Sequence, residues 1–286
     1  MSDTQPETFP LGKAVNMAYR SLFLHPLYAL RICWAWIVVM TSARIASDIL
    51  KADLLTDAAG EPLLGFDLTF FIGWFLFIPL ASIAVAWHRL LLFGERDDAL
   101  IYLRLDRLVA SYFGFAVLLY AISLAPVVGV RGVYQVMELF LGVIDGSTDK
   151  VKLPTMARSI NAWLQVGAFL VFLAVSARLS VVLPGKAFDG QGLTLKRAWK
   201  VTRGNTWGVM MGFIACIVPF LVLTALLRRS GFNFSLEDGA LLHIADWLVI
   251  ESMGAVLGLI EMSYLTFCFR FFFPRQNQQI SAPLSA

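Results

Sequence analysis

Long runs of apolar residues alternate with short polar segments along most of the chain. Six runs reach the roughly 20 residues that an α-helix needs to cross a hydrocarbon layer about 30 Å thick. They cover residues 28–47, 69–92, 108–130, 160–183, 207–227 and 247–273. Because the runs are continuous, they lack the alternating polarity of membrane-spanning strands. The pattern predicts an all-α polytopic membrane protein with six transmembrane helices.

A short basic stretch precedes each odd-numbered span. The three stretches are LGKAVNMAYRSLFLHP, ALIYLRLDRLVASYF and LTLKRAWKVTRGNTW, and each can form an amphipathic helix lying in the membrane surface. An ungapped alignment of the first and third pairs AYR at 18–20 with AWK at 198–200. We interpret the chain as three parallel repeats, each an interfacial helix followed by a helical hairpin, at about 9–94, 98–185 and 192–274. The alternative is that basic juxtamembrane helices resemble one another without being repeats.

Three further segments complete a single membrane domain over residues 1–286. Residues 133–144 carry an apolar stripe that is too short to span, so we expect a helix on the outer surface or a re-entrant helix. Residues 275–286 are polar and are expected to form a disordered tail. The initial MSDTQPETFP lacks the basic and apolar regions of a cleavable signal peptide, so the first span is expected to be retained.

Composition and charge agree with this interpretation and orient it. The chain is 58% hydrophobic and 15% charged, with a mean hydropathy of +0.73. Short cytoplasmic loops retain Lys and Arg. With the N-terminus inside, 15 of the 23 basic residues, including Arg89, Arg96 and Arg104, lie on the inner side. The other 8 lie outside: Arg44, Lys51, Arg131, Lys150, Lys152, Arg158, Arg228 and Arg229. The distribution predicts cytoplasmic termini and gives no support for a nucleic-acid partner.

Ionisable side chains inside the spans are the main functional candidates, because a charge near the bilayer centre costs at least about 2.5 kcal/mol. Glu261 lies near mid-membrane and must be protonated, paired or in contact with water. Arg178 and His88 are its nearest potential partners in depth, and Glu251 lies at a depth similar to Arg44, so those two could pair. Our favoured interpretation of Glu261 is an ion pair that locks the repeats together. The alternative is a proton or cation site.

Glycines spaced four apart mark two faces for close helix packing. Gly204, Gly208 and Gly212 begin the fifth span, and Gly254 and Gly258 lie in the sixth. Small residues at this spacing let helix backbones approach closely. A neighbour within the same chain is the simpler interpretation, because a six-span bundle already requires internal contacts. A second copy of the chain is the alternative.

The cysteines, the histidines and the absence of known catalytic motifs argue against catalysis and metal binding. Cys33, Cys216 and Cys268 fall within spans, are odd in number and form no CxxC, so they are interpreted as packing residues. The three His lie near opposite membrane faces without HExxH, and no GxSxG, Walker loop or GxGxxG occurs. Trp87 and other tryptophans near span ends are expected to be interfacial anchors. We therefore expect no catalytic residues, no metal, no cofactor and no enzymatic activity.

The first basic stretch and the segments AWKVTRGNTWGVMMGF and AVAWHRLLLFGE resemble the YciC-like proteins and the membrane domain attached to some glycerophosphoryl diester phosphodiesterases. The resemblance covers nearly the whole chain and implies a fold and a bacterial inner-membrane location, but no reaction. Two functional classes remain. The first is a non-enzymatic membrane component that organises lipid, or accompanies another membrane protein or a second copy. The alternative is a small-solute transporter or channel whose path passes Glu261.

Overall fold

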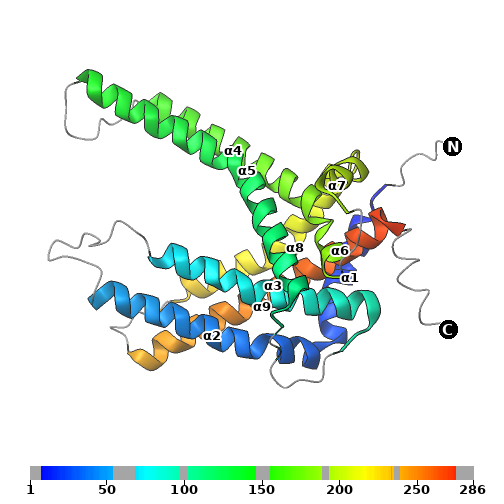
Figure 1. Ribbon diagram of the computed structural model, residues 1–286. Coiled ribbons are helices and arrows are strands. Elements are labelled where there is room, and N and C mark those ends of the chain that lie inside the picture. Colours follow the sequence, from blue (N-terminus) through cyan, green and yellow to red (C-terminus); the bar gives the residue numbers. More distant parts are fainter. Residues whose placement is uncertain are drawn as a thin grey trace.

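The computed structural model describes residues 8–53, 68–96, 102, 104–145, 155–188, 193–232, 234 and 239–274. All regular elements in these ranges are helices, which confirms the all-α prediction (Figure 1). They are α1 (Leu11–Leu24), α2 (Pro26–Asp53), α3 (Leu68–Phe93), α4 (Arg107–Asp145), α5 (Thr155–Ser180), α6 (Leu183–Lys186), α7 (Leu195–Val201), α8 (Thr206–Arg229) and α9 (Ala240–Phe272).

Several of these helices fit an integral membrane protein. Within the described residues, five are long and apolar enough to cross a membrane: Pro26–Ile49 of α2, Arg107–Val136 of α4, Ser159–Ser180 of α5, Thr206–Arg229 of α8 and Ala240–Phe272 of α9. The remaining expected span coincides with α3, whose shorter apolar stretch is Phe77–Phe93.

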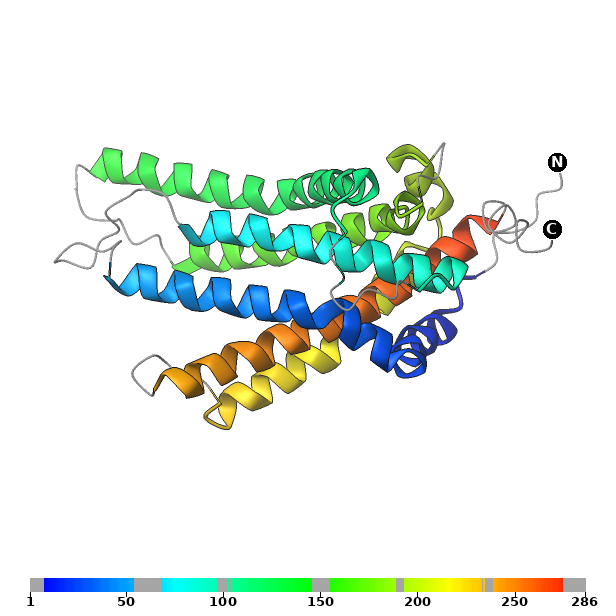
Figure 2. The same cartoon turned by 60° about the horizontal axis from the view of Figure 1, so that its bottom comes forward.

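Helix α9 is the centre of the packing. It contacts α1, α2, α3, α6 and α8, and the other pairs in contact include α2 with α3, α4 with α5 and α5 with α8. Figure 2 shows α1, α6, α7 and the last turns of α9 gathered at one end of the long helices. In Figure 1, α4 and α5 extend together away from the other long helices. We call the end that carries α1, α6 and α7 the α1 end.

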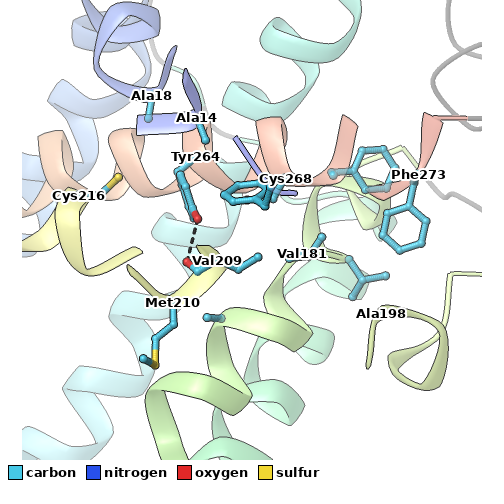
Figure 3. Packing of buried hydrophobic residues seen from close by; sticks show 14 of the residues in the cluster. Ala14, Ala18, Val181, Ala198, Val209, Met210, Cys216, Tyr264, Cys268 and Phe273 are labelled. Carbon is cyan, nitrogen blue, oxygen red and sulfur yellow. Dashed lines mark hydrogen bonds between the residues drawn. The ribbon is translucent and has the colours of Figure 1, made fainter. Parts of the chain in front are cut away.

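The largest buried cluster lies where α1 packs on α8 and α9 (Figure 3). Ala14 and Ala18 are fully buried, so the face of α1 that carries them is in contact with other helices. Tyr264 of α9 donates a hydrogen bond of 2.8 Å to the Val209 carbonyl of α8. The Tyr19 hydroxyl donates to the Cys216 carbonyl at 3.2 Å. Helix α1 is therefore held by both apolar packing and hydrogen bonds.

Helix α4 corrects two expectations. The second basic stretch does not form a separate helix within its described part, because α4 begins only at Arg107. The Asp106 carboxylate fixes that start by accepting from the Leu108 and Val109 N–H groups, both at 3.0 Å. The apolar stripe at 133–144 is also no separate helix, since α4 continues without a break to Asp145. Pro126 lies inside the helix and does not end it.

Candidate functional site

The proposed partners of Glu261 lie elsewhere. Glu261 is half-buried, and among the described residues its carboxylate has no hydrogen-bond or ion-pair partner. Cys216 of α8 is a titratable neighbour of Glu261. The pairing of Glu261 with Arg178 or His88 is therefore wrong, because both of those side chains are engaged by other groups.

His88 belongs to a buried polar network that joins three helices. Its Nδ1 lies 2.8 Å from the Thr266 hydroxyl of α9, and its Nε2 lies 3.2 Å from the Tyr112 hydroxyl of α4. Next to it, the Trp87 indole donates to the Ser263 hydroxyl at 2.7 Å. Trp87 is fully buried among protein side chains, so it does not reach lipid headgroups as the expected anchor would. The network aligns α3, α4 and α9 with one another.

Arg178 ties the end of α5 to α7. Its guanidinium donates to the Thr202 hydroxyl at 3.1 Å and to the Trp199 carbonyl. It also lies 3.5 Å from the centroid of the Trp199 ring, which is a cation–π distance. All of these contacts are within the chain, so Arg178 holds the short helix in place.

The end of the bundle away from α1 carries matched charges on α2, α8 and α9. Two ion pairs of 3.3 Å lie there, Arg44 with Glu251 and Arg228 with Asp246, and Nε2 of His243 lies 3.3 Å from the Asp48 carboxylate. The structure thus brings together Arg44 and Glu251, as their depths suggested. Opposite charges face each other, and the described residues contain no group of His, Cys, Asp or Glu that could hold a metal ion. The arrangement connects three helices.

The glycine faces behave differently from one another. A Cβ at Gly208 would lie 3.2 Å from the Phe9 ring, and one at Gly212 would lie 2.6 Å from the Tyr264 ring, so both make close contacts within the chain. Gly204 is not a packing residue: it precedes α8 in a turn with φ +89°. Gly254 has open space at its Cβ position, and Gly258 approaches only Met262 of its own helix.

The structure contains a basic pocket that the sequence analysis did not identify. It has a volume of about 340 Å³, near the lower end of the roughly 300–1,000 Å³ typical of ligand sites. It lies between α2, α3 and the segment after α3. Its lining residues, which we call the arginine pocket, are Tyr28, Ala86, Arg89, Glu95, Arg96, Tyr102 and Arg104. Three arginines against one glutamate give these residues a formal charge of +2.

Arg89 and Glu95 form one wall of the arginine pocket. Gly94 adopts φ +71°, the left-handed conformation that ends many helices, and its N–H bonds the Leu90 carbonyl at 2.8 Å. The chain therefore turns back at the end of α3 and brings Glu95 to Arg89, with Nε and Oε2 2.7 Å apart. Arg89 also donates to the Ala187 carbonyl at 3.4 Å.

Arg96 forms the part of the wall nearest the junction of α1 and α2. It lies 3.4 Å from Nδ1 of His25, the residue between these helices. Burial and the charge of Arg96 both lower the pKa of His25 from its ordinary value. A neutral His25 can accept this hydrogen bond from the guanidinium, whereas a protonated one would repel it.

Arg104 is fixed by its neighbours. Its guanidinium pairs with the Asp106 carboxylate and hydrogen-bonds Tyr102. The backbone N–H of Arg104 donates to the Ser82 hydroxyl at 3.3 Å. Burial would raise the pKa of Asp106, but the Val109 and Leu108 N–H groups and Arg104 together hold it below its ordinary value. The carboxylate of Asp106, which caps α4, thus holds the Arg104 guanidinium at the start of this helix.

In the sequence alone, the three arginines indicate only the orientation of the spans. A usable signal was present: Arg89 lies near the end of one apolar run, and Arg96 and Arg104 follow Gly94 in the connection to the next run. No family model, curated protein or solved structure matches the chain.

Proposed function

We propose that this chain is a non-enzymatic integral membrane protein that organises anionic lipid through the arginine pocket. In this proposal six spans form three hairpins in a bacterial inner membrane, and the first and third hairpins are preceded by helices near the membrane surface, α1 and α7. Both termini are cytoplasmic. The apolar helices and the excess of Lys and Arg at the α1 end support this arrangement. The resemblance to YciC-like proteins points to the same compartment.

The arginine pocket is the observation that carries the proposal. Three guanidinium groups converge at the α1 end, where α2 begins and α3 ends. Guanidinium forks match phosphate oxygens in geometry and charge. Basic pockets between transmembrane helices on the cytoplasmic side suit the phosphate of a lipid headgroup.

Exposed apolar side chains beside the pocket favour a lipid over a soluble phosphate compound. Leu27, next to Tyr28 in the pocket wall, is 81% exposed, and Leu105, next to Arg104, is 63% exposed. Apolar side chains of this size gain free energy when acyl chains cover them. The same region therefore offers cations for a headgroup and apolar surface for its tails.

Lipid retention in gentle detergent tests the proposal. Purified protein is analysed by native mass spectrometry after exposure to equal amounts of phosphatidylglycerol and phosphatidylethanolamine. We expect the wild type to retain phosphatidylglycerol preferentially. Arg96→Gln should weaken retention about tenfold, because a hydrogen bond to a charged group contributes about 1.5 kcal/mol.

Arg20→Gln is the matched control, since Arg20 is exposed on α1 and lies outside the pocket. It removes the same charge at the same end of the protein and should leave retention unchanged. Equal retention of the two lipids by the wild type, or an equal loss in both variants, would contradict the proposal.

A second candidate function is a proton or cation path past Glu261. The observation that favours it is the absence of a partner for this half-buried carboxylate among the described residues. Reconstituted vesicles with a pH-sensitive dye would test it. Glu261→Gln should abolish a proton flux that the wild type supports, and a wild type that carries no flux removes this candidate.

A further inference from the structure

Glu95 is the single acid among the residues that line the arginine pocket. Its Oε2 lies 2.7 Å from both Nε and one terminal nitrogen of Arg89, so one carboxylate oxygen occupies a side of the guanidinium fork. That side is where a phosphate would bind with two oxygens. Asp106 pairs with Arg104 and His25 lies beside Arg96, but neither Asp106 nor His25 lines the pocket.

The two partners of this ion pair differ in how firmly they are held. Arg89 is on the last turns of α3, donates to the Ala187 carbonyl at 3.4 Å and lies 5.8 Å from the Phe93 ring centroid. Its side chain is 20% exposed. Glu95 follows Gly94 outside the helix, and its side chain is 49% exposed. Glu95 can therefore move into solvent while Arg89 stays in place.

We propose that Glu95 is a built-in competitor for the arginine pocket, whose carboxylate is displaced from Arg89 by the phosphate group of an anionic lipid. The inference rests on the proposed function and adds a regulation of the same site. A carboxylate and a phosphate compete for one fork, so binding replaces one anion by another and the guanidinium never lacks a partner. Exposed ion pairs are weak, so displacement lowers lipid affinity only about threefold.

Competition has a consequence that simple charge repulsion lacks. If Glu95 acts by occupying Arg89, its removal helps lipid binding only when Arg89 is present. A negative charge acting at a distance would oppose an anionic lipid with or without Arg89. A double-mutant comparison of these two residues therefore separates the mechanisms.

The test is a titration of full-length protein in detergent with short-chain phosphatidylglycerol, with glycerol 3-phosphate in a parallel arm. We expect Glu95→Gln to bind phosphatidylglycerol about threefold more tightly than wild type. In an Arg89→Gln background, adding Glu95→Gln should give no gain.

Glu251→Gln is the matched control for this titration. It also removes a carboxylate that pairs with an arginine, Arg44, but it does so outside the pocket, at the other end of the bundle. The folded Glu251→Gln protein should therefore bind phosphatidylglycerol as wild type does. A threefold gain in this variant as well would show that any lost negative charge favours the lipid, which overturns competition at Arg89.

The outcomes separate the two proposals. Unchanged affinity of Glu95→Gln, with Arg96→Gln still weakened, overturns the role of Glu95 and leaves the proposed function standing. The same gain from Glu95→Gln with and without Arg89 also overturns competition. Binding of glycerol 3-phosphate as tight as that of phosphatidylglycerol assigns the pocket to a soluble phosphate compound. Absence of phosphatidylglycerol binding in every protein removes the proposed function itself.

Discussion

Gly212 gives the sharpest test of how α8 packs on α9. A Cβ at this position would lie 2.6 Å from two carbons of the Tyr264 ring, well inside an ordinary contact. The ring is fully buried, and its hydroxyl donates to the Val209 carbonyl one turn away at 2.8 Å. Gly212→Ala must therefore displace either Tyr264 or the helix.

The expected cost follows from three contributions. Overpacking a well-packed core costs about 1–3 kcal/mol. A lost Tyr264 hydrogen bond costs about 1 kcal/mol. Alanine recovers about 1 kcal/mol through its higher helix propensity. The free energy of unfolding should therefore fall by about 1–3 kcal/mol, and the unfolding midpoint by several degrees at roughly 2–4 °C per kcal/mol.

Gly254→Ala is the matched control, because it makes the same change in α9 where nothing lies within 4 Å of the new Cβ. Thermal unfolding in detergent, followed by circular dichroism and by loss of the monodisperse peak, compares the two variants with wild type. A Gly212→Ala protein as stable as wild type would refute the packing argument. A Gly254→Ala protein as unstable as Gly212→Ala would show instead that Gly254 faces a second copy.

Three further predictions concern the polar residues. Retention of phosphatidylglycerol should rise as the pH falls from about 7.5 to about 5.5. The reason is that a nearby phosphate raises the lowered pKa of His25, which couples lipid binding to proton uptake. His25→Asn should flatten this pH profile in the same native mass spectra. Trp87→Phe should lower the free energy of unfolding by about 0.5–1.5 kcal/mol through the lost bond to Ser263, whereas Trp163→Phe, at a 76% exposed position, should leave the melting curve unchanged. Glu261→Gln should leave thermal stability intact because no ion pair is lost, while Glu251→Gln should lower the free energy of unfolding by up to about 1 kcal/mol by leaving Arg44 unpaired. A larger loss of stability in Glu261→Gln than in Glu251→Gln would mean that Glu261 does form a structural ion pair.

The sequence predicted the depth of a residue along its helix better than the direction in which its side chain points around the helix axis. Apolar runs locate the helices, and equal depth correctly suggested the contact between Arg44 and Glu251. Depth failed for Glu261 and His88. His88 bonds Thr266, which is five residues from Glu261 and therefore about 140° away around α9. Two groups at one depth meet only if their helices also turn the right faces toward each other, and apolar runs do not record that rotation.

The ends of helices were harder still to predict. The hydrocarbon thickness predicts that the third span stops near residue 130, but α4 continues to Asp145. The arginine pocket depends on Gly94 ending α3 and on Asp106 starting α4. Each signal is visible in the sequence, yet the convergence of Arg89, Arg96 and Arg104 appears only when both turns are combined in three dimensions.

Native mass spectrometry of the full chain with phosphatidylglycerol and phosphatidylethanolamine, comparing wild type, Arg96→Gln and Arg20→Gln, tests the central claim most directly. The account predicts preferential retention of phosphatidylglycerol by the wild type and Arg20→Gln, and about tenfold weaker retention by Arg96→Gln. Equal retention of both lipids by all three proteins would contradict it.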